Sequence, residues 1–433
     1  MEEGQEKLVE EPVYITKLEI NGVNCFKEEY TIDFTNKEGK PSMWNVLLGN
    51  NNTGKTTLLR IVAALGTPHD IHERYNVEDI EDYEGGYPNN ATFISIEKHI
   101  SSIGKYQEDS DYLSQALIEI NKQNTGFDEK IYSEFTVFDE TMLVSTSPIP
   151  IIIDAYGTQR KRGKASFIEY ELNNRIHSLF DDNTETIINA EEWFLGTDYN
   201  FKSGHGSSGK NLEQVKAALI QVLPDVVDIS TNIDGKRRVY FHTKAGDKVL
   251  INQLGSGYQS LITWVVDYAK RQFDRYPESP NPLAEPGIVL VDEIDLHLHP
   301  TWQRKVISFL RGLFPKTQFI VTAHSPLVVQ SADDINVVVL HRDEETEEIR
   351  IEQPELTNFQ GWSVERILEQ LMNAQIHSDE YLKWENQFKA AVQENDYSKA
   401  IKAYEALKNI DVAENVLEVL SYQLQIIKLQ ANA

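Results

Sequence analysis

The sequence predicts an α/β protein built on a mainly parallel β-sheet. Three short apolar runs, WNVLL at 44–48, GIVLVDE at 287–293 and QFIVTAHS at 318–325, have the length and composition of buried strands. Helical apolar spacing follows the first run at 58–65 and the second at 301–314. Strands that alternate with helices in this way favour parallel pairing, with the helices on the faces of the sheet.

The remaining segments add smaller parts to this core. Residues 14–21 alternate apolar and polar side chains, which predicts an antiparallel subsheet at the N-terminus. We expect residues 67–253 to include inserted, mostly helical segments, among them a helix at 111–123. From residue 362 the pattern is helical to the end. The predicted organisation is therefore one ATPase-sized domain over 1–361 and a short all-helical region over 362–433 that binds a partner or packs on that domain.

Composition restricts the functional classes. The chain has 433 residues, 40% of them hydrophobic, a net charge of −27 and a single cysteine, Cys25. The single cysteine excludes an intrachain disulfide and a thiolate metal cluster. No apolar run is long enough to cross a bilayer, and the acidic start differs from a secretory signal, so we expect a cytoplasmic protein without membrane contact. The negative charge argues against a general DNA-binding surface and leaves two basic patches, 160–164 and 236–238, as DNA contacts or solvated loops.

A glycine-rich loop between the first strand and its helix predicts a phosphate site. The sequence GNNNTGKT fits G-x-x-x-x-G-K-[ST]. In this pattern the glycines let successive backbone N–H groups turn towards phosphate oxygens, and the following helix adds its positive end. Lys55 reaches the β- and γ-phosphates, and the Thr56 hydroxyl binds Mg²⁺. The predicted ligands are therefore ATP and Mg²⁺, and the predicted loop residues are Gly49, Asn50, Asn51, Asn52, Thr53, Gly54, Lys55, Thr56 and Thr57.

Two acidic residues end the apolar strand at 287–293. A carboxylate at the end of a buried strand is costly unless it meets a cation. We expect Asp292 to hold Mg²⁺, directly or through water, and Glu293 to polarise the attacking water as a general base. The alternative is a strand that simply ends in solvent. The phosphate loop earlier in the chain favours the catalytic interpretation.

Further motifs follow in a recognisable order. The segments DEIDLHLHP at 292–300, WQ at 302–303 and FIVTAHSP at 319–326, together with the phosphate loop, resemble the ABC-type ATPases of the SMC/RecF/OLD branch over residues 14–345. The resemblance implies an ABC-type P-loop ATPase head. It also implies that His324 is the switch histidine that contacts the γ-phosphate. Asp295, where the family often has glutamate, would open the D-loop that crosses to a second subunit.

ABC-type enzymes also carry a signature sequence that caps the ATP of the partner subunit. The segment LGSGYQS at 254–260 resembles it, and the resemblance therefore assigns Leu254, Ser256, Gly257 and Tyr258 to nucleotide binding. The family's usual serine after the leucine is Gly255 here, which leaves Ser256 as the candidate for the hydroxyl. Gln159 is at the position of the Q-loop that senses Mg²⁺ and the γ-phosphate, with Arg160 as the competing candidate. The resemblance thus implies a head-to-head homodimer, or a higher homo-oligomer, with ATP at the interface.

Two expected features of related proteins are missing from the sequence. Residues 58–253 show no sustained heptads, unlike the coiled-coil arms of SMC proteins. The helical remainder after residue 345 is too short for a nuclease domain, so we expect no nuclease activity from the chain itself. A compact ATPase with a helical tail resembles the PtuA family of Septu anti-phage systems, and the segments at 360–368 and 395–400 are similar to it.

That last resemblance implies a regulatory ATPase, with slow turnover possible, that controls a separate HNH nuclease of the PtuB kind. Nucleic acid would then be reached through the complex. Two other functions stay open from the sequence. One is a RecF-like DNA repair ATPase that binds DNA directly, and the other is a non-catalytic module that dimerises on ATP.

Overall fold

In the computed structural model the chain divides into two compact units, a head unit, Met1–Val364, and a tail unit, Glu365–Ala433. Each unit is described by itself. The described residues are 13–23, 25–66, 92–100, 113–120, 132–139, 142–144, 153–160, 175–180, 187–203, 208–223, 225–232, 237–343, 346–375, 377–410 and 414–431.

The centre of the head unit is a 6-stranded sheet. Its strands are β3 (Trp44–Gly49), β8 (Ile153–Tyr156), β12 (Gly287–Val291), β13 (Thr317–Ala323), β14 (Asn336–Arg342) and β15 (Ile349–Glu352). They lie in the order β15-β14-β3-β13-β12-β8, and all neighbours are parallel except β15, which is antiparallel to β14. This arrangement confirms the predicted α/β fold with a mainly parallel sheet.

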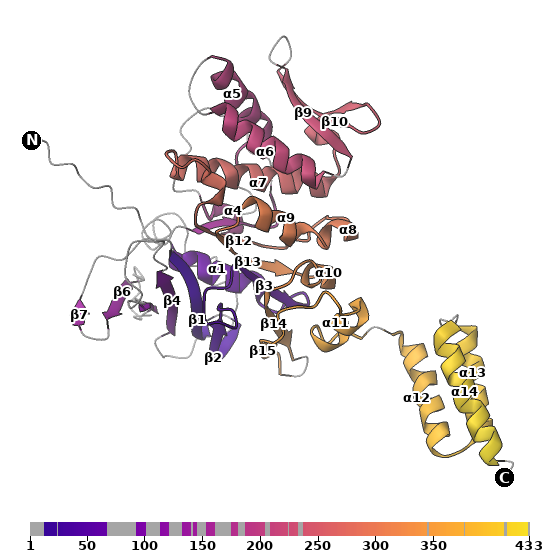
Figure 1. The fold of residues 1–433 in the computed structure, drawn as a ribbon. Helices are drawn as coiled ribbons and strands as arrows, with labels where there is room; N and C mark the ends of the chain where they lie inside the picture. The colour runs from indigo at the N-terminus through magenta and orange to yellow at the C-terminus, as the bar shows by residue number, and fades with distance from the viewer. Residues whose placement is uncertain are drawn as a thin grey trace, which may run out of the picture. The chain divides into compact units, whose positions relative to one another are not determined.

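Burial explains why these residues form central strands. Every residue of β3 and of β13 is buried, because helices cover both faces of a parallel sheet. The helix after β3 is α1 (Lys55–Gly66), and its apolar side packs into the same core as the sheet. Since β3, β13 and β12 are adjacent and parallel, the loops that follow them meet at one edge of the sheet (Figure 1). Open α/β sheets bind ligands at this edge.

A second, antiparallel sheet contains the N-terminal strands, as predicted. Its strands are β1 (Val13–Val23), β2 (Phe26–Asp33), β4 (Thr92–Ile100), β5 (Leu113–Ile120), β6 (Tyr132–Asp139) and β7 (Met142–Val144), in the order β2-β1-β4-β5-β6-β7. The prediction of a helix at 111–123 is therefore wrong. β5 pairs along its length with β4 and β6, and such pairing overrides local helical spacing.

The inserted segments within residues 67–253 accordingly combine strands with helices. Its helices are α4 (His177–Phe180), α5 (Ala190–Lys202) and α6 (Ser208–Val222), and β9 (Val226–Asn232), β10 (Arg238–Thr243) and β11 (Lys248–Val249) form a small antiparallel sheet. The long helix α7 (Ser256–Arg275) follows, and α5 and α6 both pack against it (Figure 1). The shorter elements are η2 (Ile251–Gln253), η3 (Pro282–Ala284), α8 (Pro300–Gln303), α9 (Val306–Leu313) and α10 (Pro326–Val329).

Buried charges fasten α7 to strand β8. Asp154 is fully buried in β8, and its carboxylate lies 2.7 Å from Arg275 and 3.6 Å from Arg271 of α7. Arg271 also pairs with Asp267 at 2.6 Å, and the Tyr156 hydroxyl donates to Asp267 at 2.8 Å. Burial alone would raise the pKa of Asp154, but the arginines hold it below its ordinary value. Removing Asp154 would take away the carboxylate that both arginines approach, so these buried pairs fix how α7 packs on β8.

The tail unit is helical, as predicted, and has its own core. Its helices are α11 (Val364–Gln370), which begins at the end of the head unit, α12 (Asp379–Gln393), α13 (Tyr397–Asn409) and α14 (Glu414–Ala431). Phe388, Leu407 and Leu424 are buried between α12, α13 and α14. Ser378 caps α12 and Asp396 caps α13 through their side chains. Among the helices in the described part of the chain, none is long and apolar enough to cross a membrane.

Candidate nucleotide site

The loop after β3 has a backbone shape that needs glycine. Gly54 has a φ of 87°, and a Cβ there would lie 2.8 Å from the Cys25 sulfur. A Cβ on Gly49 would overlap the carbonyl oxygen of Leu340. Asn52 also adopts a positive φ of 63°, which asparagine tolerates. The three asparagines are exposed, so the loop presents its backbone to the outside and leads directly into α1.

Lys55 lies inside this loop. Its ammonium donates to the carbonyl oxygens of Gly49 at 3.0 Å and Asn50 at 2.6 Å, and the residue is only 5% exposed. Thr53, by contrast, closes the loop locally through its hydroxyl, which donates to Asn50 at 3.0 Å. Burial lowers the pKa of Lys55 to about 8, although the carboxylates of Asp292 and its neighbours oppose this shift. The lysine is therefore placed where the loop would hold phosphate groups.

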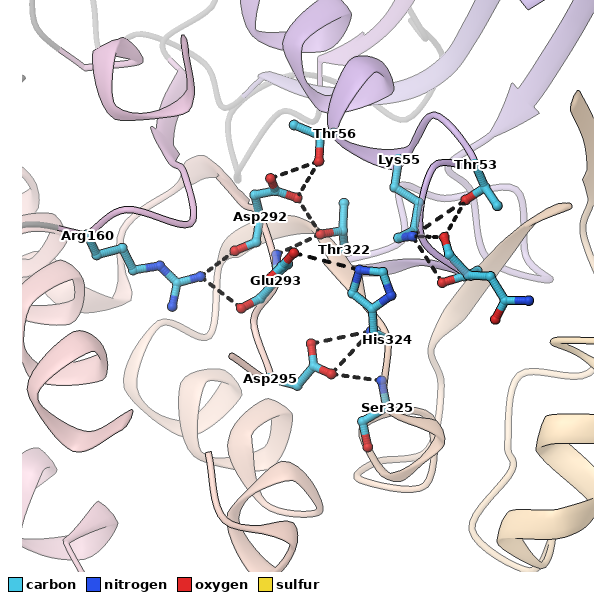
Figure 2. A network of polar contacts seen from close by, with 12 residues as sticks. Thr53, Lys55, Thr56, Arg160, Asp292, Glu293, Asp295, Thr322, His324 and Ser325 are labelled. Atoms are coloured by element: carbon cyan, nitrogen blue, oxygen red, sulfur yellow. Dashed lines mark hydrogen bonds and ion pairs between the residues drawn. The ribbon is translucent and has the colours of Figure 1, made fainter. Parts of the chain in front are cut away.

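Asp292 joins the phosphate loop to the end of β12. The Thr56 hydroxyl donates to its two oxygens at 2.9 and 3.1 Å, and the Thr322 hydroxyl of β13 donates to one of them at 2.6 Å (Figure 2). The Thr322 hydroxyl in turn accepts the backbone N–H of Glu293 at 2.6 Å. Sequence reasoning missed Thr322. A hydroxyl two residues before His324, in the apolar run that ends β13, was the available signal.

These oxygen atoms suit a magnesium ion. Hydroxyl and carboxylate oxygens are its preferred ligands, and Mg²⁺ usually uses one or two protein groups with substrate phosphates and water. Thr56 and Asp292 offer such a pair, one at the start of α1 and the other directly after β12 (Figure 2). Among the described residues there is no group of three or more His, Cys, Asp or Glu side chains that could hold a metal. The donor set therefore fits an ion that ATP helps to bind.

Glu293 and His324 face each other beside this site. The imidazole Nε2 lies 3.8 Å from the Glu293 carboxylate, too far for a direct hydrogen bond, and each side chain is 32% exposed. Burial and the positive charge of Lys55 lower the pKa of His324, so the imidazole is neutral at pH 7. Glu293 has a φ of 47°, which is uncommon for glutamate and marks a constrained position. Both side chains lie close to Asp292 (Figure 2).

Asp295 contacts its own chain in the structure. Its carboxylate accepts the backbone N–H groups of His324 at 3.2 Å and Ser325 at 2.7 Å. The Ser325 hydroxyl donates to Gln303 at 2.7 Å, which ties the same turn to the last residue of α8. Asp295 is 8% exposed. Its carboxylate thus holds the turn that contains His324, while the crossing of the D-loop to a second subunit stays a prediction.

The structure distinguishes Arg160 from Gln159. Arg160 is buried, and its guanidinium donates to the carbonyl oxygens of Asp292 and Glu293, the latter at 3.0 Å. It also donates to the Ser260 hydroxyl of α7 at 3.3 Å. Burial lowers the pKa of Arg160 to about 10, so it stays charged at pH 7. Gln159 is exposed, and both residues line a cavity of about 230 Å³ beside the start of α7 and His297.

Arg160 is thus an internal residue and does not belong to a basic surface. The rest of the patch expected at 160–164 lies outside the described residues. In the second patch Arg237 and Arg238 are exposed, and residue 236 lies outside the described residues.

The signature segment forms the first turn of α7. Gly255 caps the helix, Ser256 begins it, and both are exposed. Gly257 is buried, and a Cβ there would overlap the carbonyl oxygen of His297, so this turn packs closely on the D-loop. Leu254 is half-buried, and the Tyr258 ring packs edge-on to Trp302 with centroids 6.3 Å apart. The contacts drawn around Lys55 and Asp292 in Figure 2 include none of these signature residues.

Sequence comparison places the chain in a family. Residues 44–330, more than half of the chain, match the model of the family described as "AAA domain, putative AbiEii toxin, Type IV TA system". The chain belongs to this AAA-domain family. The match begins at β3 and ends just after α10, so it contains the phosphate loop, the acidic pair and His324. The chain is accordingly a P-loop ATPase-type protein of this AAA-domain family.

Two curated relatives share most of the chain. The Septu protein PtuA of Bacillus thuringiensis is 27% identical over 394 residues, which are 89% of this chain and 90% of that protein. The Septu protein PtuA of Bacillus mycoides (strain KBAB4) is 28% identical over 373 residues, 85% of this chain but only 46% of that protein, so this chain spans about half of its length. The SMC head domain from Thermotoga maritima covers 79% of this chain with 13% identity and a TM-score of 0.41.

Proposed function

We propose that the head unit binds ATP with Mg²⁺ and hydrolyses it. The observation that carries this proposal is the connection from Thr56 through Asp292 to Thr322, which joins the phosphate loop to the ends of two neighbouring strands. Glu293 and His324 flank this connection, and both side chains are partly exposed. A phosphate loop, a carboxylate for the metal and a second carboxylate for the water are the parts that phosphoryl transfer to water requires.

Each residue then has a separate task. Lys55 and the loop N–H groups bind the β- and γ-phosphates, and Thr56 and Asp292 hold Mg²⁺, which neutralises phosphate charge when it is bound. Glu293 accepts a proton from the attacking water, and the neutral His324 donates a hydrogen bond to the γ-phosphate. The chain itself makes no nuclease cut in this proposal.

The signature turn requires a second copy of the chain. Ser256 and Gly255 are exposed at the N-terminus of the long helix α7, outside the contacts around Lys55. In the proposed head-to-head dimer this turn reaches the γ-phosphate in the partner, and each ATP lies between one phosphate loop and one signature turn. ATP binding and dimerisation are therefore linked, and hydrolysis releases the pair.

The biological role that we propose is anti-phage defence, with control of a separate HNH nuclease subunit. Two relatives named Septu protein PtuA support this role, and one of them matches this chain over nearly its whole length. The tail unit is an independent helical module that is available to bind such a subunit. ATP turnover in the head would act as a timer for the nuclease, and slow turnover would suit that purpose.

A two-step experiment tests this proposal. Co-expression with an HNH nuclease of the PtuB kind is expected to give a stable complex, whose DNA cleavage responds to ATP. The Lys55→Ala variant is expected to keep the complex and to abolish that response, because it removes the phosphate contact. Glu278→Gln, an exposed change away from the site, is the matched control. A complex that cleaves DNA identically with and without ATP would contradict the proposed control of the nuclease. If the chain hydrolyses no measurable ATP, the proposed hydrolysis is wrong and a module that only dimerises on ATP is favoured.

The second candidate is a RecF-like DNA repair ATPase. The exposed pair Arg237 and Arg238, at the start of β10, is the observation that favours it. Direct duplex binding by the purified chain, with an affinity that falls steeply as salt rises, would support this candidate. Reversal of both charges in Arg237→Glu with Arg238→Glu should then abolish binding, while binding that survives this change would exclude the patch.

A further inference from the structure

The last helix of the tail unit has two apolar faces. Leu420, Leu424 and Ile427 of α14 are buried against α12 and α13. A second stripe on the same helix faces outward and consists of Val419, Tyr422, Ile426 and Leu429, whose exposed fractions are 57%, 56%, 56% and 73%. A helix that is apolar on both sides is normally covered on both sides. The outer stripe therefore indicates a surface that another helix covers.

The outer stripe has the spacing of a coiled-coil seam. Its residues follow one another at steps of three, four and three, which keeps them on one line of the helix. The nine residues from Val419 to Ile427 carry no charge, although a quarter of the whole chain is charged. The outer stripe is thus a continuous neutral strip, and it would not repel an identical strip on a second chain, even though each chain carries a net charge of −27.

The order of residues within the outer stripe points to a particular occupant. The stripe is symmetric about Leu424, because Val419 and Leu429 are equally far from it and so are Tyr422 and Ile426. In an antiparallel pair related by a two-fold axis, Val419 of one copy would lie beside Leu429 of the other. Tyr422 would likewise lie beside Ile426, so small and large side chains would alternate along the seam.

We propose that the outer stripe of α14 pairs antiparallel with α14 of a second copy of this chain. The seam buries less surface than a permanent dimer interface, so we expect a reversible pairing that a high concentration of the chain favours. It differs from the head-to-head dimer because it involves no nucleotide. Heads paired through ATP and tails paired through α14 would together give assemblies larger than a dimer.

Disulfide trapping tests the pairing and its direction. Chains carrying Val419→Cys and differently tagged chains carrying Leu429→Cys, both in a Cys25→Ser background, are mixed and oxidised mildly without nucleotide. We expect a 419–429 disulfide between the two kinds of chain and none between two Val419→Cys chains, which antiparallel pairing keeps about 15 Å apart. A 419–419 disulfide would show parallel pairing, and the absence of any disulfide would show that no second copy covers the stripe. Either result overturns the proposal.

Charge insertion gives an independent measurement on the full chain. Ile426→Glu with Leu429→Glu is expected to lower the molar mass measured by light scattering without nucleotide. Val227→Glu, an exposed apolar residue of the head with an exposed fraction of 52%, is expected to leave the mass unchanged. Lys55→Ala should keep the tail pairing, so failure of the proposed ATPase function and failure of this inference are distinguishable. If the double variant keeps its mass but loses a co-expressed nuclease, that subunit is the occupant and self-pairing is wrong.

Discussion

The phosphate loop at the end of β3 and the signature turn at the start of α7 are both glycine-containing turns that open a helix, yet their surroundings differ. Around the phosphate loop, Lys55 and Thr56 already have partners within the chain, and Asp292 is 3% exposed. At the signature turn, Gly255 and Ser256 point to the outside. One half of the proposed site is thus assembled before any ligand binds, while the other half offers donors that are free to meet a partner.

This difference assigns separate functions to the two halves. Pre-assembled groups lower the cost of reorganisation when charge develops during hydrolysis. In the proposed dimer the exposed donors contribute only after a second chain arrives, so hydrolysis would depend on dimerisation. Arg160 connects the halves in one chain, because it holds the carbonyl oxygens of Asp292 and Glu293 and also contacts Ser260 one turn into α7.

The largest effect is expected from Glu293→Gln in the pre-assembled half. The change removes the proton acceptor, and we expect kcat to fall by on the order of 10²–10⁴-fold. The backbone N–H of Glu293 still bonds to Thr322, so ATP binding should persist and the ATP-bound dimer should accumulate. Turnover assays, together with molar mass in the presence of ATP, measure both outcomes.

The same charge change at Glu278, which is exposed and distant from the site in sequence, serves as the control and should leave kcat unaltered. If Glu293→Gln hydrolyses ATP at the normal rate, another group activates the water and the catalytic role of Glu293 is wrong.

The next effect concerns the exposed half. Ser256→Glu places a negative charge where the partner's γ-phosphate would lie, and we expect the hydrolysis rate to fall by about 10²-fold. Mixing this variant with the inactive Lys55→Ala should restore activity, since mixed dimers contain one intact site. An equal mixture is expected to reach about a quarter of the wild-type rate, because half of the dimers are mixed and each has one site of two.

A matched control is Ser398→Glu, which changes another exposed serine in the first turn of a helix and should keep full activity. If the two inactive variants do not rescue each other while both still bind to wild-type chains, the signature turn does not complete a site in a second subunit.

Sequence reasoning located the pre-assembled half because its elements are local. A strand, a glycine loop and a helix follow one another at 44–66, and their apolar spacing is visible without the fold. The acidic pair after β12 was equally visible as charge at the end of an apolar run. These patterns also predicted the α/β class and the helical tail correctly.

Features that depend on distant pairing were harder to predict. The helix expected at 111–123 is strand β5, whose partners β4 and β6 lie on either side of it in the sheet. The positions of Gln159 and Arg160 could be compared only in the fold, which brings the segments after β8 and β12 close to the start of α7. The buried charges of Asp154 and Asp267 could have been suspected from single acidic residues within apolar runs, but their arginine partners are assigned only by the packing of α7 on β8.

A smaller effect separates Arg160 from Gln159. Arg160→Ala leaves buried carbonyl oxygens without a donor, so we expect the free energy of unfolding to fall by about 2–3 kcal/mol. The rate of hydrolysis should fall by about tenfold, because Glu293 loses its support. Gln159→Ala should change the free energy of unfolding by less than about 0.5 kcal/mol, since this side chain is exposed. Urea unfolding and turnover assays decide between them, and the reverse order of effects would make Gln159 the functional contact.

The smallest expected effect is the uptake of a proton by the pre-assembled half when ATP binds. Burial lowers the pKa of Lys55 to about 8, below the ordinary 10.5 of the unfolded chain. The unfolded chain therefore holds more protons between about pH 8 and 10.5, and the contribution of Lys55 to the free energy of unfolding rises with pH across this window. Binding of the triphosphate favours the charged ammonium of Lys55. When ATP binds, Lys55 should therefore take up about half a proton at pH 8 and nearly one proton at pH 9. Calorimetry in buffers of different ionisation enthalpy measures this uptake. Lys55→Arg, which stays charged, should abolish it, and Ser256→Glu should retain it, because the proton belongs to the half that needs no partner. Equal uptake in wild type and Lys55→Arg would mean that another group binds the proton.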